Sequence, residues 1–146
     1  MTTSHSMETK QHTSLRYDDV QVGDEVPTLV IPLTRTLIVA TAIASRDYQD
    51  VHHDKDAAIR RGTPDIFMNI LSTNGFVGRF ITDWAGPDAI LKSVKIRLGA
   101  PNHPGDTMTM TGKVSAKDDG VIEVQVRGAN DIGDHVTGTV AVELPR

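Results

Sequence analysis

The chain has 146 residues, no cysteine and a formal net charge of −4. The lack of cysteine excludes disulfides, thiolate metal ligands and a cysteine nucleophile, and an excess of acidic over basic residues does not favour binding to a phosphate backbone. No apolar run approaches the roughly 18 residues that span a membrane, and residues 1–15 lack the apolar core of a signal peptide. We therefore expect a cytoplasmic protein with a flexible tail at residues 1–15 and one domain at residues 16–146.

The first part of the domain predicts one strand and one helix. Residues 26–33 are extended, with prolines near both ends, which is typical of an edge strand. Apolar residues at helical spacing predict a helix over residues 37–44, capped by Thr34 or Thr36. That helix would end near Asp47, and a loop and a short helical turn that stops at Gly62 would follow.

A long central helix is the next predicted element. Thr63 suits its N-cap and Pro64 its first position, and Gly86 marks its end. The helix would have roughly 20 residues and a length of about 30 Å. It is apolar on nearly all sides, so we expect it to be buried. Asn74 lies on its apolar stripe, where a buried polar group needs a partner.

After Pro87 the hydrophobic period changes to two. Strands are predicted at residues 91–98, 107–114, 121–128 and 136–142, with turn sequences between them. This spacing indicates a four-stranded antiparallel meander beside the early strand. The fold class is therefore α+β, with one antiparallel sheet wrapped around the central helix. An uncovered sheet edge would favour dimerisation.

The segment 46–54 gathers the proton-handling side chains of the chain. Asp47 and His52 are five positions apart in the loop after the first helix. A neutral imidazole can accept a proton near pH 7, and a nearby carboxylate can hold the same water. The N-terminus of the central helix follows closely and could polarise a carbonyl oxygen. This set suits the addition of water to an enoyl thioester, or thioester hydrolysis.

Plainer interpretations of these residues stay open. Asp47 and His52 could be a hydrogen-bonded pair within a loop. The run 52–54 could ligate a metal, but adjacent histidines point in different directions and no third histidine is near, so we expect no metal site. Asp50 and Asp54 are expected to be solvated carboxylates or helix caps. His103 and His135 fall in predicted turns, where a position facing solvent is the default.

The segment also resembles the signature of the MaoC-like, or R-specific enoyl-CoA hydratase, family. That signature has an Asp followed by Asn-Pro-hydrophobic-His, and the matching residues here are Asp47, Gln49, Asp50, Val51 and His52. The family's glycine before the Asp is Arg46 in this chain. The resemblance extends over about residues 25–143. Segments 46–54, 65–71 and 82–87 are similar to the small MaoC-like subunits of actinobacterial hydratases for steroid (cholesterol) side-chain degradation.

The resemblance implies a single hot-dog domain that adds water reversibly to a trans-2-enoyl-CoA, giving a 3-hydroxyacyl-CoA. Asp47 would orient the water, and His52 would act as base and then as acid. The substrate-binding residues would be Gln49, Asn74 and Ile66, the last through a backbone N–H to the thioester oxygen. The resemblance also implies a bulky steroid acyl group, and the glycines in the central helix, which leave room for it, agree with this.

No cofactor is expected, because coenzyme A is part of the substrate. The family implies a homodimer, or a heteromer with a second MaoC-like subunit. The alternatives are a hot-dog acyl-CoA thioesterase and a non-catalytic acyl-binding subunit of a heteromeric hydratase.

Overall fold

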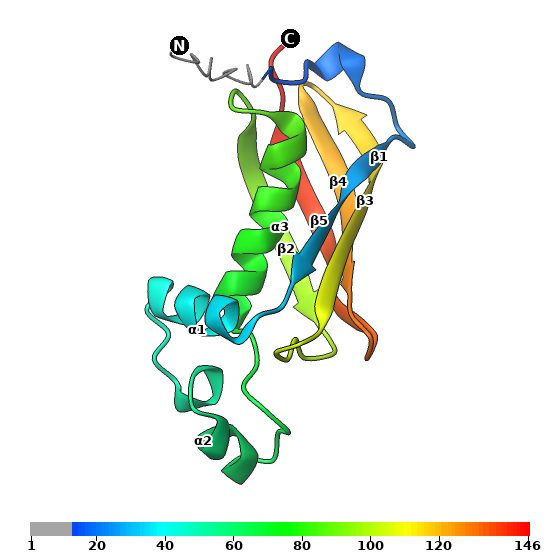
Figure 1. Cartoon of the computed structure of the whole chain (residues 1–146). Helices are drawn as coiled ribbons and strands as arrows, with labels where there is room; N and C mark the ends of the chain where they lie inside the picture. Colours follow the sequence, from blue (N-terminus) through cyan, green and yellow to red (C-terminus); the bar gives the residue numbers. More distant parts are fainter. Residues whose placement is uncertain (1–12) are drawn as a thin grey trace, which may run out of the picture.

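The computed structural model describes residues 13–146. Most of the predicted tail, residues 1–12, lies outside the described residues, and in the last part of that tail the Leu15 N–H donates to the carbonyl oxygen of Ala85 at 2.9 Å. Figure 1 shows the elements, which in chain order are β1 (Glu25–Pro32), α1 (Arg35–Ala44), α2 (Lys55–Arg60), α3 (Ile70–Ala85), β2 (Ile90–Leu98), β3 (Thr107–Asp118), β4 (Val121–Ala129) and β5 (Asp134–Glu143). Short 3₁₀ turns lie at Tyr17–Asp19 and Asp50–His52. Within residues 13–146, no helix is long and apolar enough to cross a membrane.

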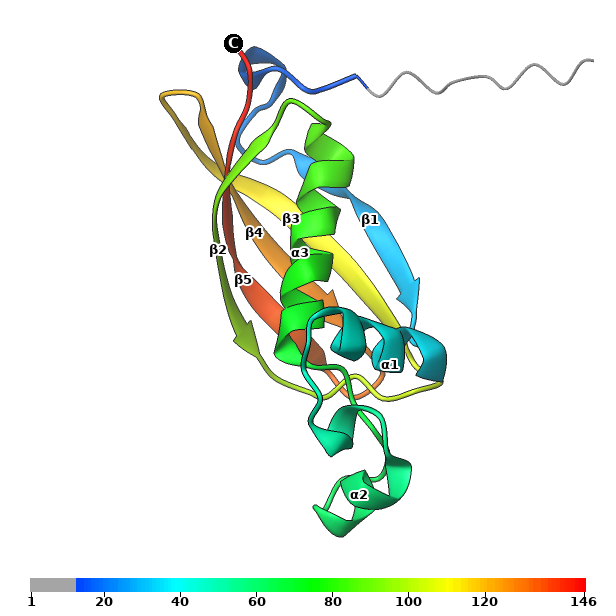
Figure 2. The ribbon, with the colours of Figure 1, turned by 90° about the vertical axis from the view of Figure 1, so that its left-hand side faces the viewer.

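The sheet has five strands in the order β1-β3-β4-β5-β2, and all its pairings are antiparallel. It curves around α3, which crosses one of its faces (Figure 2). The predicted α+β hot-dog architecture is confirmed. The predicted meander of four consecutive strands is wrong in one connection, because β2 pairs with β5 and not with β3. Only β3, β4 and β5 follow each other through tight turns, whereas residues 99–106 carry the chain from one side of the sheet towards the other.

The predicted start of the central helix at Thr63 is wrong. Helix α3 spans Ile70–Ala85, so it has 16 residues and is roughly 24 Å long. Its N-cap is Asn69, whose side-chain oxygen accepts a hydrogen bond from the Ser72 N–H at 3.1 Å. The predicted end is confirmed, since Gly86 follows with a φ of 90°.

Tertiary hydrogen bonds explain why Thr63 does not start a helix. Its hydroxyl lies 3.0 Å from the carbonyl oxygen of Ala58 and so closes the end of α2. In a helix that began at Thr63, the N–H of Phe67 would bind the carbonyl of Thr63. Instead it donates to the carbonyl oxygen of Val51 at 3.3 Å. Thr63 thus forms a capping hydrogen bond, but it caps the end of α2. The segment after Thr63 is bound to the loop that follows α1 and is not helical.

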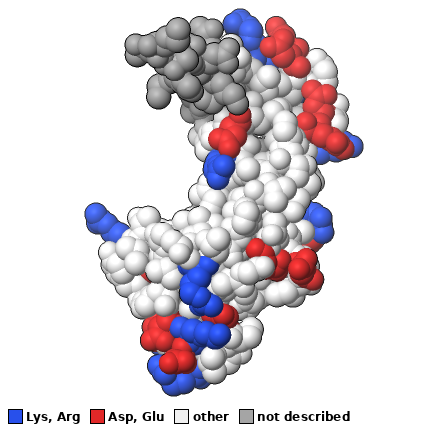
Figure 3. All heavy atoms as spheres, viewed as in Figure 1, with Lys and Arg blue, Asp and Glu red and all other residues white. Residues whose placement is uncertain are grey.

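Helix α3 is buried on one side only. The side that faces the sheet consists of buried residues, namely Thr73, Val77, Phe80, Ile81 and Ala85. On the other side Ile70 is 52% and Leu71 49% exposed, so the prediction of a helix buried all round is wrong. Figure 3 shows a hollow on the left-hand side of the molecule, and charged side chains gather mainly at the upper right and lower ends instead. One sheet covers only one face of a helix, so the other face stays open in this chain.

A paired carboxylate joins the start of α1 to the segment before α3. Both oxygens of Asp65 accept hydrogen bonds from the Arg35 guanidinium at 2.9 Å. This pairing lowers the pKa of the Asp65 carboxyl well below its usual range. A carboxyl whose folded-state pKa is depressed contributes stability above its unfolded pKa of about 4, and this contribution is lost as the pH falls below that value.

We therefore expect Asp65→Asn to lower the free energy of unfolding at pH 7, with a smaller difference from the unsubstituted chain at pH 3. Urea denaturation at the two pH values measures this. The matched control is Asp83→Asn, because Asp83 forms an exposed pair with Arg79 within one helix and such pairs contribute little. An equal loss of stability at both pH values would contradict the assignment.

Candidate active site

Asp47 follows α1 directly, after a turn with left-handed backbone conformation. The N–H of Asp47 donates to the carbonyl oxygen of Ala42 at 3.0 Å, which reverses the chain after the helix. Arg46 makes the turn with a φ of 57°, a conformation that disfavours residues with a side chain. The requirement for this backbone shape accounts for the glycine of the hydratase signature at the same position.

We expect Arg46→Gly to raise the free energy of unfolding by up to about 1 kcal/mol, because the strain at Arg46 exceeds the added freedom of glycine in the unfolded chain. Arg46→Ala is the matched control, since it removes the same exposed charge but keeps the strain. Chemical denaturation of both variants measures the difference. Equal stability of the glycine and alanine variants would show that the turn is unstrained.

His52 is buried and has one ring nitrogen already engaged. Its side chain is 7% exposed, and its Nδ1 lies 2.7 Å from the carbonyl oxygen of Phe67. A carbonyl oxygen can only accept, so Nδ1 carries the proton in the neutral ring. The Phe67 ring packs edge-on against the imidazole, with the ring centroids 5.0 Å apart. The lone pair of Nε2 is therefore free to accept a proton.

Asp47 and His52 meet at one point. The Oδ2 atom of Asp47 lies 3.4 Å from the Nε2 atom of His52. With neutral His52, both atoms are acceptors, so a water placed beside them can donate one hydrogen to each. The pKa of the Asp47 carboxyl is lowered, chiefly by the hydrogen bond from the Asn69 side chain. Asp47 is thus held as a carboxylate, while His52 is the group that can take a proton.

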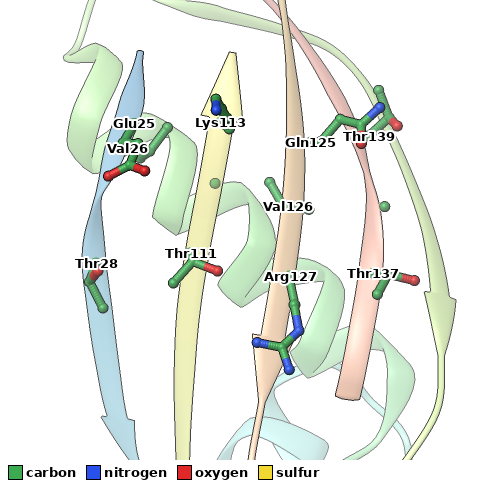
Figure 4. A pocket seen from close by; sticks show the side chains of 12 residues that line it. Glu25, Val26, Thr28, Thr111, Lys113, Gln125, Val126, Arg127, Thr137 and Thr139 are labelled. Carbon is green, nitrogen blue, oxygen red and sulfur yellow. The ribbon is translucent and has the colours of Figure 1, made fainter. Parts of the chain in front are cut away.

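The pair opens into a pocket of about 370 Å³. Its walls come from the loop after α1, the start of α3 and the segment after β2, and the lining residues include Asp47, Gln49, His52, Phe67, Asn69, Ile70, Leu98, Gly99 and His135. A larger hollow of about 580 Å³ lies on the opposite face of the sheet. Figure 4 shows that threonines line much of it, and it contains neither Asp47 nor His52. The smaller pocket is therefore the candidate active site.

Comparison with known proteins identifies the family. The profile of the MaoC like domain matches residues 19–135. The chain belongs to the MaoC-like domain family. A curated relative is the beta subunit of 3-oxo-4,17-pregnadiene-20-carboxyl-CoA hydratase from Mycobacterium tuberculosis, which is 51% identical over 123 residues that cover 84% of this chain and 95% of the relative.

Solved structures of MaoC-like proteins agree with this assignment. The ChsH1–ChsH2 complex from Mycobacterium tuberculosis contains a chain that is 51% identical to this one, with a TM-score of 0.84 over 85% of this chain and 98% of that one. The R-hydratase PhaJ1 from Pseudomonas aeruginosa has the same fold, with a TM-score of 0.84 at 19% identity over 91% of this chain and 87% of that one. The resemblance seen in the sequence is thereby confirmed for both family and fold.

The MaoC-like fold does not leave the Ile66 N–H available for substrate. That group donates to the Asp65 carboxylate at 2.7 Å, and the Ile66 side chain is fully buried. The backbone N–H groups of Asn69 and Ile70 have no acceptor within residues 13–146, as expected at the start of a helix. Both residues line the pocket. The Ile66 N–H is therefore already engaged, whereas two free N–H groups at the start of α3 belong to residues that line the pocket.

The other two predicted substrate-binding residues differ in position. Asn74 is on the exposed side of α3 and lines a separate groove with Gly78 and Leu91. The prediction of a buried Asn74 is wrong, because the sheet covers only the opposite side of the helix. Gln49 lies at the pocket, and its backbone N–H donates to Oδ1 of Asp47 at 3.2 Å.

The histidines in the predicted turns are not exposed. His135 is buried at 3% exposure, with Nδ1 2.7 Å from the carbonyl oxygen of Ala100 and Nε2 2.8 Å from the hydroxyl of Thr73. Burial lowers the pKa of His135. It lies inside β5, which begins two residues before the predicted strand, so the turn assignment is wrong. His103 is half-buried, and its Nδ1 lies 2.9 Å from the carbonyl oxygen of Ile66.

Sequence reasoning gave the loop carboxylates their correct roles but missed Asn69. Asp54 caps α2 by accepting from the Ala57 N–H at 3.0 Å, and Asp50 pairs with Arg61 at 3.2 Å. Asn69 is 1% exposed and donates to the Asp47 carboxylate at 3.1 Å. Asparagine is a favoured N-cap residue, but the stronger signal at Thr63 and Pro64 concealed it.

Proposed function

We propose that this chain is the catalytic subunit of an enoyl-CoA hydratase that acts on a steroid side-chain carboxyl-CoA. The observation that carries the proposal is the pair of acceptors, Asp47 Oδ2 and His52 Nε2, 3.4 Å apart at the wall of a pocket. The substrate class rests on 51% identity to the beta subunit of 3-oxo-4,17-pregnadiene-20-carboxyl-CoA hydratase. Coenzyme A enters as part of the substrate, and the chemistry needs no further cofactor.

The hydration uses the pair as a water holder and a proton carrier. Asp47 and His52 orient a water toward the β-carbon of the enoyl thioester. As the water oxygen bonds to that carbon, Nε2 of His52 takes a proton, and the double-bond electrons move to the thioester oxygen. The imidazolium that forms faces the Asp47 carboxylate, which stabilises it. His52 then gives the proton to the α-carbon, so one water has been added and the enzyme is unchanged.

The start of α3 completes the mechanism. Negative charge develops on the thioester oxygen when the double-bond electrons shift. The free N–H groups of Asn69 and Ile70 lie at the positive end of the helix dipole and can donate to that oxygen. Gln49 lines the same pocket, which supports a role in contacting the substrate beside the thioester.

A second MaoC-like subunit is the proposed partner. The similar chain belongs to the ChsH1–ChsH2 complex, and the matched relative is named as a beta subunit. The open side of α3 and the unpaired edge of β2 are surfaces that such a subunit could cover. A partner there would add walls to the pocket, because the segment after β2 lines it.

The test is an assay that separates hydration from hydrolysis. The chain, with and without a second MaoC-like subunit, is supplied with a steroid side-chain enoyl-CoA and with crotonyl-CoA. Loss of enoyl absorbance without release of free thiol supports hydration. Release of free coenzyme A would instead establish the thioesterase alternative. If an active complex kept its full rate after replacement of both Asp47 and His52 by alanine, this chain would be a non-catalytic subunit.

A further inference from the structure

Asn69 is a buried amide with all its hydrogen-bonding groups in use. Its Nδ2 donates to Oγ of Ser45 at 2.9 Å and to Oδ2 of Asp47 at 3.1 Å. Its Oδ1 accepts from the backbone N–H of Ser72 at 3.1 Å and from the hydroxyl of the same serine. An asparagine amide has two donor hydrogens and one acceptor oxygen with two lone pairs. The side chain is therefore saturated, and neither serine nor aspartate, which lack the amide donors, can make the same four bonds.

The helix fixes which way this amide points. The N–H of Ser72 is one of the unpaired donors in the first turn of α3, and a backbone N–H can only donate. The oxygen of the amide must therefore face Ser72, which turns the nitrogen toward Asp47. A flipped amide would place its NH₂ group against a backbone donor and its oxygen against a carboxylate. The orientation of the donor at Asp47 is thus set by the start of α3.

We propose that Asn69 is a positioning residue for hydration, which aims the Asp47 carboxylate at the water shared with His52. It would act through Asp47, by holding Oδ2 as an ionised acceptor, as well as by capping α3. This inference rests on the proposed hydratase function and adds a residue on which that chemistry depends. Through Asn69, the start of α3 would determine where the Asp47 carboxylate holds the water.

Two features of the site support a role beyond the cap. Asn69 is 1% exposed, so its amide is shielded from solvent and its bonds are made within the protein. The bond from Asn69 is also the main reason that the pKa of the Asp47 carboxyl is lowered. His52 is the titratable group that faces Asp47, while Ser45 and the backbone of Gln49 are uncharged. Loss of the amide donor therefore leaves few groups to keep Asp47 ionised and oriented.

The test uses variants of Asn69 that keep a helix cap. Asn69→Ser and Asn69→Asp both retain a capping oxygen, but neither can donate an amide hydrogen to Asp47. We expect kcat of the assembled hydratase to fall by about 10- to 100-fold with serine, as for a small misplacement of a reacting group. The fall should be larger with aspartate, which places a second carboxylate beside Asp47. The KM should change little, because Asn69 would not bind the substrate through its side chain.

The pH dependence separates positioning from simple stability. In Asn69→Ser, the pKa of the Asp47 carboxyl should rise, because the hydrogen bond that chiefly lowers it is lost. A ¹³C NMR titration of the Asp47 carboxyl measures the same change without substrate. Thr34→Ala is the matched control, because it removes the N-cap of α1 and leaves the contacts of Asp47 in place. It should lower the melting temperature and leave kcat and the Asp47 titration unchanged.

The possible outcomes distinguish this inference from the proposed function. If Asp47→Ala abolishes hydration while Asn69→Ser keeps the full rate and an unchanged Asp47 titration, the role of Asn69 is wrong and the proposed function stands. If Asp47→Ala keeps the full rate, the proposed function itself fails. A lower rate in Asn69→Ser with an unmoved Asp47 titration would make Asn69 only a helix cap and would also overturn the inference.

Discussion

Replacing His52 with glutamine should lower kcat for hydration by roughly 10²- to 10⁴-fold, the usual contribution of a general acid–base group. Glutamine can still accept a hydrogen bond, but it cannot take a proton from water or return it to carbon. The ring is buried and Nδ1 is engaged by the Phe67 carbonyl oxygen, so Nε2 is the nitrogen that can do this. The enoyl absorbance assay on the assembled complex measures the loss, and substrate affinity should change far less than kcat.

The neighbouring histidine provides the control for this prediction. His53 follows His52 directly, and its side chain is exposed. His53→Gln makes the same chemical change one residue away, and we expect its rate to stay within about twofold of the unsubstituted enzyme, as is usual for surface substitutions. A large loss in His53→Gln with little change in His52→Gln would mean that the base has been assigned to the wrong residue.

The largest expected loss of stability comes from Gly138→Ala in β5. A Cβ atom there would overlap the carbonyl oxygen of Lys95 and lie 3.0 Å from the Cα of Ile96. Both are backbone atoms of β2, which pairs with β5 along its length. Backbone atoms in a paired strand cannot move aside as a flexible side chain can. We expect the free energy of unfolding to fall by about 3 kcal/mol, at the upper end for overpacking, as measured by urea denaturation.

For a glycine in α3, we expect the same substitution to raise the free energy of unfolding. Apart from the backbone of the helix itself and the two neighbouring residues, no atom lies within 4 Å of a Cβ built on Gly75, which is in the middle of the helix. Gly75→Ala should therefore stabilise the chain by up to about 1 kcal/mol through helix propensity. The two substitutions add the same methyl group, so their difference isolates the close approach of β2 to Gly138. A similar effect of both substitutions would contradict this interpretation.

The fold could be predicted largely because its signals are local. Strand periodicity over residues 107–114 and 121–128 falls within β3 and β4, since alternation along one strand reflects which face is buried. The place of β2 beside β5 has no such signal, because strand order depends on where a connection crosses the sheet. The start of α3 was misplaced because Thr63 is a favoured N-cap residue. In the structure its hydroxyl donates to the carbonyl oxygen of Ala58 instead of capping a helix.

The proposed catalytic pair was predictable for a related reason. Asp47 and His52 lie in one short loop, so their spacing alone brings them near each other, and the structure places them 3.4 Å apart. Asn69 contacts Asp47 across 22 positions in the sequence. His135 reaches Thr73 across 62 positions. No spacing rule connects residues so far apart, which is why both were missed.

The sequence by itself therefore determined the fold class, the end of the central helix and the closeness of Asp47 and His52. Each of these depends on interactions between residues close along the chain. Only the tertiary structure decided where α3 begins, which side of it is covered, and which groups contact Asp47. These depend on hydrogen bonds between distant segments, whose donors and acceptors find their partners only once the sheet has closed around the helix.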